Sequence, residues 1–281
     1  MAVPHRDVHT RRMTFSYPTG TLRQHYVDGD LVMSHVVAVL SGMFPEGEDF
    51  FVRSVRDRRP RVTDPELTSQ VAGFIGQEVT HGREHRDLND KLTEMGYRSN
   101  KVDRHVRRLL ALGDKALSKN QRLAITAALE HYTATLAECL LEDPEAQALL
   151  GDTEVRSLLL WHALEESEHK AVAFDVYRAA GGGEALRIWT MRIVSTIFVL
   201  EIIGQTFLSL LRDRSAYNPV ILFRSLWALR RSPFLQPKIL RKLRTYNKRG
   251  FHPDDWDATE LIDRWRLELF GEQGTLVDHL K

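Results

Sequence analysis

Residues 161–169 read WHALEESEH, and they decide how the chain is expected to fold. At 100° per residue, His162, Glu166 and His169 fall within an arc of about 60° on one face of a helix. Val155 and Leu158, in the preceding turns, lie on the same side. Buried polar groups are costly unless they are paired or coordinated. The stretch therefore predicts a helix whose inward face carries a metal site.

Residues 77–85, QEVTHGREH, repeat this pattern. Glu78 and His81 have the same three-residue spacing as Glu166 and His169, and His85 follows one turn later. A Glu-x-x-His pair on each of two helices is typical of di-iron helical bundles. A single pair usually forms an ordinary ion pair, but two pairs on inward-facing stripes of separate helices indicate a shared centre.

Apolar residues at spacings of three and four predict four long helices at residues 28–57, 65–95, 121–142 and 152–180. Asp64-Pro65 predicts the start of the second helix, and Gly96 its end. No alternating strand pattern occurs, so the expected fold is all-α: a four-helix bundle with an additional helix or crossover at 100–119. We expect an N-terminal segment at 1–26, the bundle at 27–180 and a helical extension, packed on the bundle, at 181–281.

Two further carboxylates are candidates on the other two helices. Glu130 lies on a stripe of small and apolar residues. In residues 44–51, FPEGEDFF, both Glu46 and Glu48 are available. Glu48 has the more apolar neighbours and is preferred, although Pro45 and Gly47 are expected to distort the helix there.

Several assignments stay open at this level. Glu165 also shares a helix face with His162 and His169, so it rivals Glu166. His85 could be a ligand, a hydrogen-bond partner of a ligand or a proton relay. Three further histidines are expected to be ordinary core or surface residues: His35, His105 and His131.

Composition limits the chemistry. The chain is 43% hydrophobic and 27% charged with a formal charge of +1, which is typical of a soluble globular protein. Cys139 is the only cysteine, so an intramolecular disulfide and a multi-thiolate metal site are excluded. The first 25 residues do not resemble a signal peptide, and a cytoplasmic location is expected.

The C-terminal part has a different character. Residues 193–211 are nearly continuously apolar but include Glu201 and Gln205, which favours a buried helix packed on the bundle over a membrane span. Residues 212–249 carry eleven Lys or Arg and one acid, Asp213. This stretch could be a solvated face, or residues 188–249 could make a peripheral contact with anionic lipid. No nucleic-acid-binding motif accompanies the charge. A last helix is expected at 258–270.

The strings FPEGEDFF, FIGQEVTHGREH, WHALEESEHKAVAFDVY and GFHPDD resemble a bacterial family of predicted metal-dependent hydrolases in the ferritin-like superfamily, over residues 44–265. The chain is more distantly similar to di-iron p-aminobenzoate N-oxygenases, whose fourth helix carries His-x-x-x-Glu-x-x-His. That pattern matches His162, Glu166 and His169, which favours Glu166 over Glu165. The resemblance implies a ferritin-like bundle and a dinuclear site of Glu48, Glu78, His81, Glu130, His162, Glu166 and His169.

Three functions are considered. The first is a non-heme oxidoreductase in which two Fe ions, or Mn and Fe, activate O2 to hydroxylate, desaturate or N-oxygenate a small apolar molecule, with a ferredoxin or flavin reductase as electron donor. The alternative is a dinuclear hydrolase whose metal-bound hydroxide attacks an ester or amide. The third is a non-catalytic metal-binding helical protein. A homodimer through helix faces would be a common arrangement.

Overall fold

The computed structural model describes residues 4–151 and 153–281, and in these residues the fold is all-helical, as predicted. The only strand-like feature of the described residues is an isolated bridge between Met13 and Leu280. The helices are α1 (Leu31–Arg56), α2 (Pro65–Glu94), α3 (Ser99–Ala116), α4 (Lys119–Glu142), α5 (Pro144–Ala148), α6 (Glu154–His169), α7 (Val172–Ala179), α8 (Glu184–Leu210), α9 (Pro219–Arg230), α10 (Pro237–Thr245) and α11 (Thr259–Phe270).

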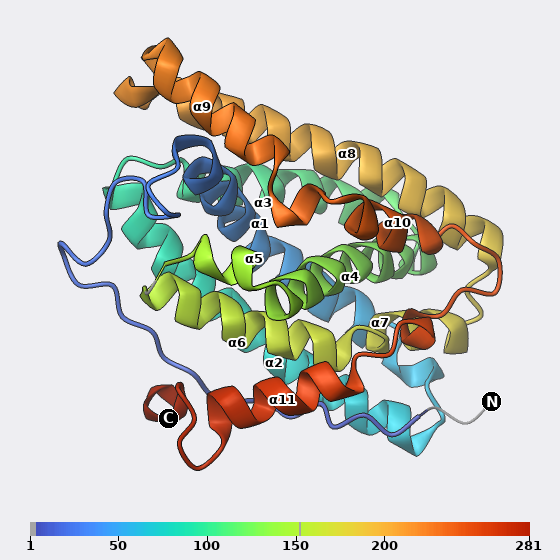
Figure 1. Ribbon diagram of the computed structural model, residues 1–281. Helices are drawn as coiled ribbons and strands as arrows, with labels where there is room; N and C mark the ends of the chain where they lie inside the picture. The colour runs from blue at the N-terminus through green and yellow to red at the C-terminus, as the bar shows by residue number, and fades with distance from the viewer. Residues whose placement is uncertain (1–3, 152) are drawn as a thin grey trace.

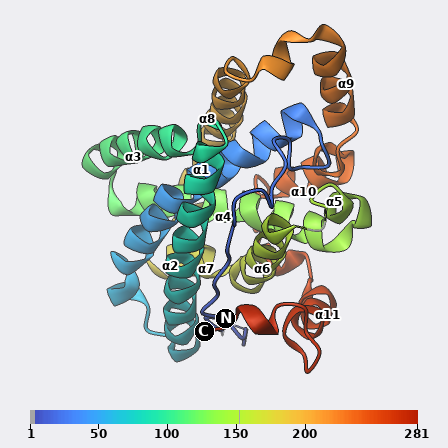
Figure 2. The same ribbon diagram turned by 90° about the vertical axis from the view of Figure 1, so that its left-hand side faces the viewer.

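Helices α1, α2, α4 and α6 form the centre of the molecule (Figures 1 and 2). Helix α1 packs against α2 and α3, and α4 packs against α6 and α8. Helix α8 lies along the top of Figure 1 and α11 along the bottom. The apolar core falls into two main clusters. One surrounds Trp161 and Leu164 of α6, and the other surrounds Phe74 of α2 and Leu123 of α4.

Local sequence signals set most helix boundaries. The Asp64 side chain caps α2 by accepting a hydrogen bond from the backbone N–H of Leu67 at 3.1 Å. Gly96, with φ +99°, follows the end of α2. Ser118 and Gln121 form a capping box at the start of α4. Pro45 lies inside α1, and the helix continues through it from Leu31 to Arg56, as the predicted single helix at 28–57 requires.

The predicted helix at 152–180 is wrong in one respect, because the chain forms two helices there. Helix α6 ends at His169 and α7 begins at Val172. At the break, the Lys170 ammonium donates to Glu138 Oε1 at 2.8 Å, which fixes the turn against α4. Neither proline nor glycine occurs at the break, so periodicity gave no sign of it. Residue 152, the predicted start, lies outside the described residues.

The N-terminal segment runs extended along α2, as both ribbon views show (Figures 1 and 2). A Cβ atom at Gly73 would lie 2.0 Å from the carbonyl oxygen of Val8, and one at Gly76 would lie 2.1 Å from Thr10 Oγ1. Two glycines of α2 therefore allow the segment to approach the helix backbone. Residues 1–3 of the predicted segment lie outside the described residues.

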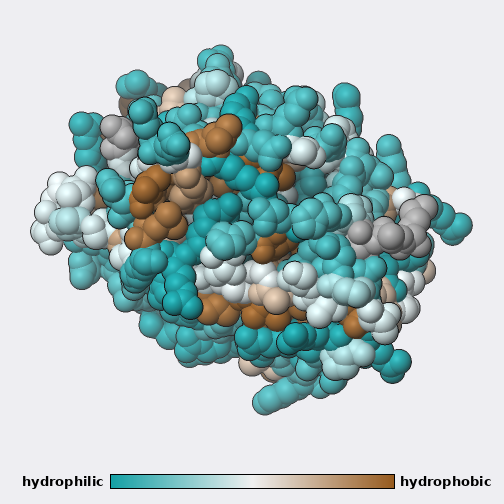
Figure 3. Space-filling model, turned by 90° about the horizontal axis from the view of Figure 1, so that it is seen from below, coloured by the Kyte–Doolittle hydropathy of each residue, from teal (hydrophilic) through white to brown (hydrophobic). Residues whose placement is uncertain are grey.

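The expectation of a buried helix at 193–211 is wrong. Helix α8 packs on α1 and α4 by one face only, and residues such as Ile193, Leu200 and Phe207 of the other face are exposed. Among the described residues, α8 is the one helix whose length and apolar composition would suffice to cross a membrane, and length and composition alone are weak evidence for a span. The opposite face of the molecule is mainly hydrophilic with separate apolar patches (Figure 3).

Candidate metal centre

The four central helices bring together the seven side chains of the expected dinuclear site. Helix α1 contributes Glu48, α2 contributes Glu78 and His81, α4 contributes Glu130, and α6 contributes His162, Glu166 and His169. Each of these residues is at most 4% exposed. The cluster therefore lies in the interior, away from bulk water.

One half of the cluster is centred on His169. Its Nε2 lies 3.2 Å from Glu78 Oε1, 3.3 Å from Glu130 Oε2 and 3.6 Å from Glu166 Oε2. Donor atoms of Glu78, Glu166 and His169 all lie within 4.8 Å of one another, so this group could hold a metal ion.

The other half of the cluster is centred on His81 and His162. His162 Nε2 lies 2.8 Å from Glu166 Oε1 and 3.8 Å from Glu48 Oε1, and His81 Nδ1 lies 3.8 Å from Glu166 Oε1. His81, His162 and Glu166 form a second group that could hold a metal ion. The two oxygens of Glu166 face the two halves, which is the arrangement of a carboxylate that bridges two ions.

Many polar atoms of the cluster are buried without a hydrogen-bond partner among the described residues. They are both carboxylate oxygens of Glu48, Glu78 and Glu130, Glu166 Oε2, His81 Nδ1 and His169 Nε2. Native proteins rarely leave buried polar atoms unsatisfied. Nine such atoms in one place fit a site that is completed by cations.

Electrostatics lead to the same conclusion. Burial, followed by repulsion from Glu166, raises the pKa of Glu48 well above its usual value. The same two effects raise the pKa of Glu130 to about 7. Burial and then repulsion from Glu130 raise the pKa of Glu78. Burial also opposes the ionised form of Glu166, but His169 and His162 outweigh it and lower the pKa of this carboxylate. Without added positive charge, Glu48, Glu78 and Glu130 resist ionisation beside the ionised Glu166.

Neighbouring residues orient two of the histidines. His81 Nε2–H donates to Glu165 Oε2 at 2.9 Å, which leaves Nδ1 facing the cluster. His169 Nδ1–H donates to Gln77 Oε1 at 2.8 Å, which leaves Nε2 facing the cluster. Burial lowers the pKa of His81 well below its usual value and keeps the ring neutral. This neutral ring, with its lone pair directed inward, is the form that binds a metal. Burial opposes the charged form of His169 as well, but Glu166 and Glu130 outweigh it and raise the pKa of this ring, which would release its proton when a cation binds.

A longer chain of hydrogen bonds orients His162. Asn89 Oδ1 accepts from the Ser41 hydroxyl at 2.8 Å, and the Ser41 oxygen accepts from His85 Nδ1–H at 2.9 Å. His85 Nε2 then accepts from His162 Nδ1–H at 2.7 Å. His162 Nε2 thereby faces the cluster, where it lies within hydrogen-bond distance of Glu166 Oε1, at 2.8 Å, and 3.8 Å from Glu48 Oε1. His85 lies one step away from the cluster centre.

The structure places the two rival carboxylates, Glu165 and Glu46, away from the cluster centre. Glu165 faces the outer nitrogen of His81 and pairs with the Arg11 guanidinium at 3.1 Å. Glu46 lies on another side of α1 and pairs with Arg107 of α3 at 2.8 Å. His35, His105 and His131 lie outside the cluster, bonded to Ser209, Glu201 and the carbonyl of Lys242.

Four residues beside the cluster were missed from the sequence. Arg11 is far from the cluster along the chain and gave no local signal. Gln77 and Asn89 share a helix with the candidate acids, so the helix-face argument that found His85 could have included them. Ser41 lies seven residues before Glu48, at a spacing of two helical turns on the same face.

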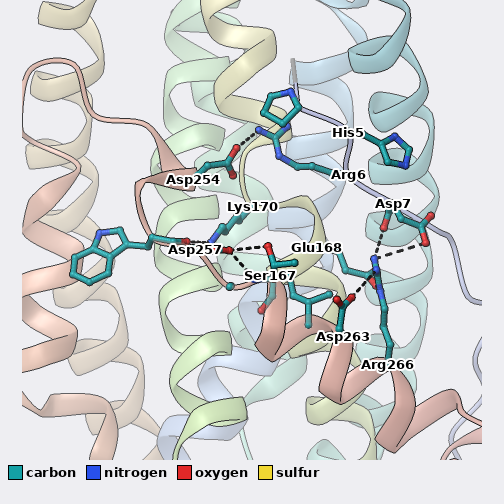
Figure 4. A pocket seen from close by; sticks show the side chains of 15 residues that line it. His5, Arg6, Asp7, Ser167, Glu168, Lys170, Asp254, Asp257, Asp263 and Arg266 are labelled. Atoms are coloured by element: carbon teal, nitrogen blue, oxygen red, sulfur yellow. Dashed lines mark hydrogen bonds and ion pairs between the residues drawn. The ribbon is translucent and has the colours of Figure 1, made fainter. Parts of the chain in front are cut away.

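A polar pocket beside the end of α6 is distinct from the cluster (Figure 4). Glu168, Lys170 and Arg266 line it, and Figure 4 shows Arg266 directed toward Asp7 and Asp263. Arg266 Nε also contacts Glu168 Oε1 at 2.7 Å. None of the seven cluster residues lines this pocket. Within the pocket Arg266 pairs with Asp7, Glu168 and Asp263, whereas Lys170 pairs with Glu138 of α4, outside the lining.

The comparisons with known proteins identify one family. The family model described as predicted metal-dependent hydrolase matches residues 9–257, which include all seven cluster residues. No curated protein and no solved structure matches the chain with significance. The family description and the buried His and Glu clusters together indicate metal dependence. The chain belongs to the family of predicted metal-dependent hydrolases.

Proposed function

We propose that this protein is a metal-dependent hydrolase with a dinuclear centre held by Glu48, Glu78, His81, Glu130, His162, Glu166 and His169. The observation that carries the proposal is the set of buried, unpartnered carboxylate and imidazole atoms that converge from four helices. The family description supports hydrolysis, the alternative from the sequence, better than the oxidoreductase that was predicted first.

The donor set suits two divalent ions. Four carboxylates balance the charge of two such ions, and three neutral imidazoles complete the ligation without adding charge. Glu78, Glu130, His169 and Glu166 would hold metal in one half of the cluster, and Glu48, His81, His162 and Glu166 in the other. A helix-borne set of this kind favours a ferritin-like four-helix bundle formed by α1, α2, α4 and α6.

A bound metal pair would polarise the carbonyl of an ester or amide and lower the pKa of a coordinated water. The protein's own residues prepare the site for this role. Glu165 and Gln77 fix the ring orientation of His81 and His169. The rings of Phe44 and Phe74 lie 4.8 Å from His162 and 4.9 Å from His169, and they exclude bulk water. His85 can hold or pass a proton between His162 Nδ1 and Ser41 Oγ.

Oxygen-dependent oxidation is the second candidate, and the closed position of the cluster favours it. The seven residues are nearly inaccessible, and neither the pocket beside the end of α6 nor the one at Phe223 and Trp227 of α9 includes any of them. Dioxygen is small and apolar and can reach such a site more easily than an ester can. The ions would then be two Fe, or Mn and Fe, and an electron donor would be required.

Elemental analysis and two activity assays test the proposal. Wild-type protein from iron-, manganese- and zinc-supplemented cells should carry about two metal ions per chain, and Glu78→Gln should carry far fewer. Glu46→Gln is the matched control, since it removes a buried carboxylate of α1 outside the cluster. Ester or amide turnover without oxygen supports hydrolysis. Substrate-dependent oxygen consumption by the iron-loaded protein, with no hydrolysis under anaerobic conditions, would contradict the hydrolase and support the oxygen-dependent enzyme.

A further inference from the structure

Helix α8 is apolar on its outer face and polar on much of its inner face. The side chains of Gln205, Thr206 and Ser209 are buried against the rest of the molecule. Ser209 Oγ contacts His35 Nδ1 of α1 at 2.8 Å. This distribution is the reverse of what a surface helix of a soluble protein normally shows. The outer face therefore needs an apolar partner.

The outer face carries a continuous apolar stripe at spacings of three and four residues. Its members are Trp189, Ile193, Ile197, Leu200, Ile203, Phe207 and Leu211, each between 47% and 63% exposed. From the first to the last member, the stripe is about 33 Å long. A monomeric soluble protein rarely exposes a stripe of this length.

Helix α9 and the preceding turn extend the apolar surface. Tyr217, Val220 and Phe223 are between 64% and 69% exposed, and Trp227 is 44% exposed. Both ribbon views place α8 and α9 at the same end of the molecule, opposite α11 (Figures 1 and 2). We name the exposed residues of 189–227 on these elements the α8–α9 surface.

Arginines without acidic partners accompany the α8–α9 surface. Six are exposed, and none forms an ion pair with a described residue: Arg192, Arg212, Arg214, Arg224, Arg230 and Arg231. Residues 189–231 contain two acids, and both have histidine partners. Glu201 pairs with His105, and Asp213 pairs with His25 and His35. The surface therefore combines exposed apolar side chains with positive charges that have no acidic partners among the described residues.

Tryptophan rings of the α8–α9 surface lie close to arginine guanidinium groups. The guanidinium groups of Arg230 and Arg231 lie 4.8 Å and 5.1 Å from the Trp227 ring, and that of Arg192 lies 5.0 Å from the Trp189 ring. Aromatic rings and basic groups together are typical of protein segments at the boundary between acyl chains and headgroups.

We propose that the α8–α9 surface docks on a lipid bilayer that contains anionic phospholipids. The apolar stripe enters the outer acyl region, and the arginines contact the headgroup phosphates. Helix α8 lies in the membrane surface and does not span it, because its polar inner face stays packed on α1 and α4. A second copy fits less well, since it would bring the six unpaired arginines against six others.

Vesicle flotation of the full chain tests this docking. We expect flotation with phosphatidylcholine vesicles that contain about one third phosphatidylserine, and weaker flotation with phosphatidylcholine alone or at high salt. The double variant Leu200→Glu, Ile203→Glu should lower partitioning by about tenfold or more. Arg230→Glu, Arg231→Glu should weaken flotation with the anionic vesicles and leave flotation with phosphatidylcholine alone unchanged, because four of the six arginines remain.

The matched control is Leu267→Glu, which introduces a charge at an exposed leucine of α11, 72% exposed, at the other end of the molecule. It should float like wild type. Circular dichroism and metal content of all variants should be unchanged, since the replaced side chains are exposed. Absence of flotation by the wild type overturns the proposal. So does a stable dimer in light scattering that Leu200→Glu, Ile203→Glu dissociates, or retention on the membrane after alkaline carbonate extraction, which indicates a span.

Discussion

Glu165 and Glu166 are neighbours in the sequence, and both are fully buried, but their carboxylates have different surroundings. Glu166 faces three histidines of the cluster, whereas Glu165 lies between His81 Nε2 and Arg11. One position along a helix rotates a side chain by about 100°, which is enough to move it from the centre of the site to its edge.

We expect the substitutions Glu166→Gln and Glu165→Gln to separate these roles. Glu166→Gln removes the carboxylate between the two halves and should abolish binding of at least one metal ion. Glu165→Gln should keep both sites but weaken metal affinity about 10- to 100-fold, as changes in residues that orient ligands do. Metal titration followed by mass spectrometry measures both. Equal losses in the two variants would contradict this assignment.

Glu130 makes the stability of the metal-free protein depend on pH. Its pKa is raised to about 7 from the ordinary value of 4.5, chiefly by burial and then by Glu166. A raised carboxyl pKa stabilises the folded state fully below the unfolded pKa, and this contribution is lost as pH rises through 7. Between pH 5 and pH 8 the chelator-treated protein should therefore lose about 2 kcal/mol of unfolding free energy through this residue.

Urea unfolding at the two pH values provides the measurement. Glu130→Gln, which is neutral throughout, should show a smaller decrease between pH 5 and pH 8 than the wild type does. Metal-loaded wild type should also show a smaller decrease, because bound cations favour the ionised carboxylates. A variant with the same pH dependence as the metal-free wild type would exclude Glu130 as its source.

At the scale of elements, the N-terminal segment completes the site although it belongs to none of the four central helices. Arg11 pairs with Glu165 and Glu168 of α6 at 3.1 and 2.8 Å, and it compensates two buried acids. The segment is held against α2 where Gly73 leaves room for the carbonyl of Val8. A buried carboxylate that loses such a partner is strongly destabilising.

Gly73→Ala should displace this segment. The added Cβ would meet backbone of Val8 at 2.0 Å, so either the segment or α2 must shift. We expect faster tryptic cleavage at Arg11 and Arg12, a stability loss of about 1–3 kcal/mol and weaker metal binding. The control is Gly47→Ala in α1, where a Cβ meets nothing within 4 Å. It should be neutral or stabilise the protein by up to about 1 kcal/mol.

The elements themselves were largely predictable because their signals are local. The cap at Asp64, the glycine at Gly96 and the capping box of Ser118 and Gln121 all lie within a few residues of the boundaries they set. The break after His169 was not predictable, since a contact between Lys170 and Glu138 of α4 accompanies it. A contact between residues that are distant in the sequence leaves no trace in the periodicity of either helix.

At the scale of the whole molecule, the central helices converge on acids that repel one another. Glu48, Glu78 and Glu130 each have a raised pKa, and each comes from a different helix. Cations at this point would connect α1, α2, α4 and α6. Metal binding and global stability should therefore be coupled.

Removal of metal is expected to lower the melting temperature by several degrees. A ligand at about a thousand times its dissociation constant stabilises the native state by about 4 kcal/mol. Differential scanning calorimetry of chelator-treated protein, with and without Fe(II), Mn(II) or Zn(II), measures the shift. Glu78→Gln should show little response to the same ions. An identical melting temperature with and without metal would argue against a site that connects the helices.

The sequence alone predicted the helical class and candidate residues for the buried cluster, because helical periodicity is a local property. Two Glu-x-x-His pairs and a lone acid on an apolar stripe were enough to single out Glu78, His81, Glu130 and His169 as candidates. Only the tertiary structure decided which of Glu165 and Glu166 faces the centre, brought Arg11 to the site and exposed the apolar face of α8. Those outcomes depend on which distant segments meet, and the pattern within a single helix does not contain that information.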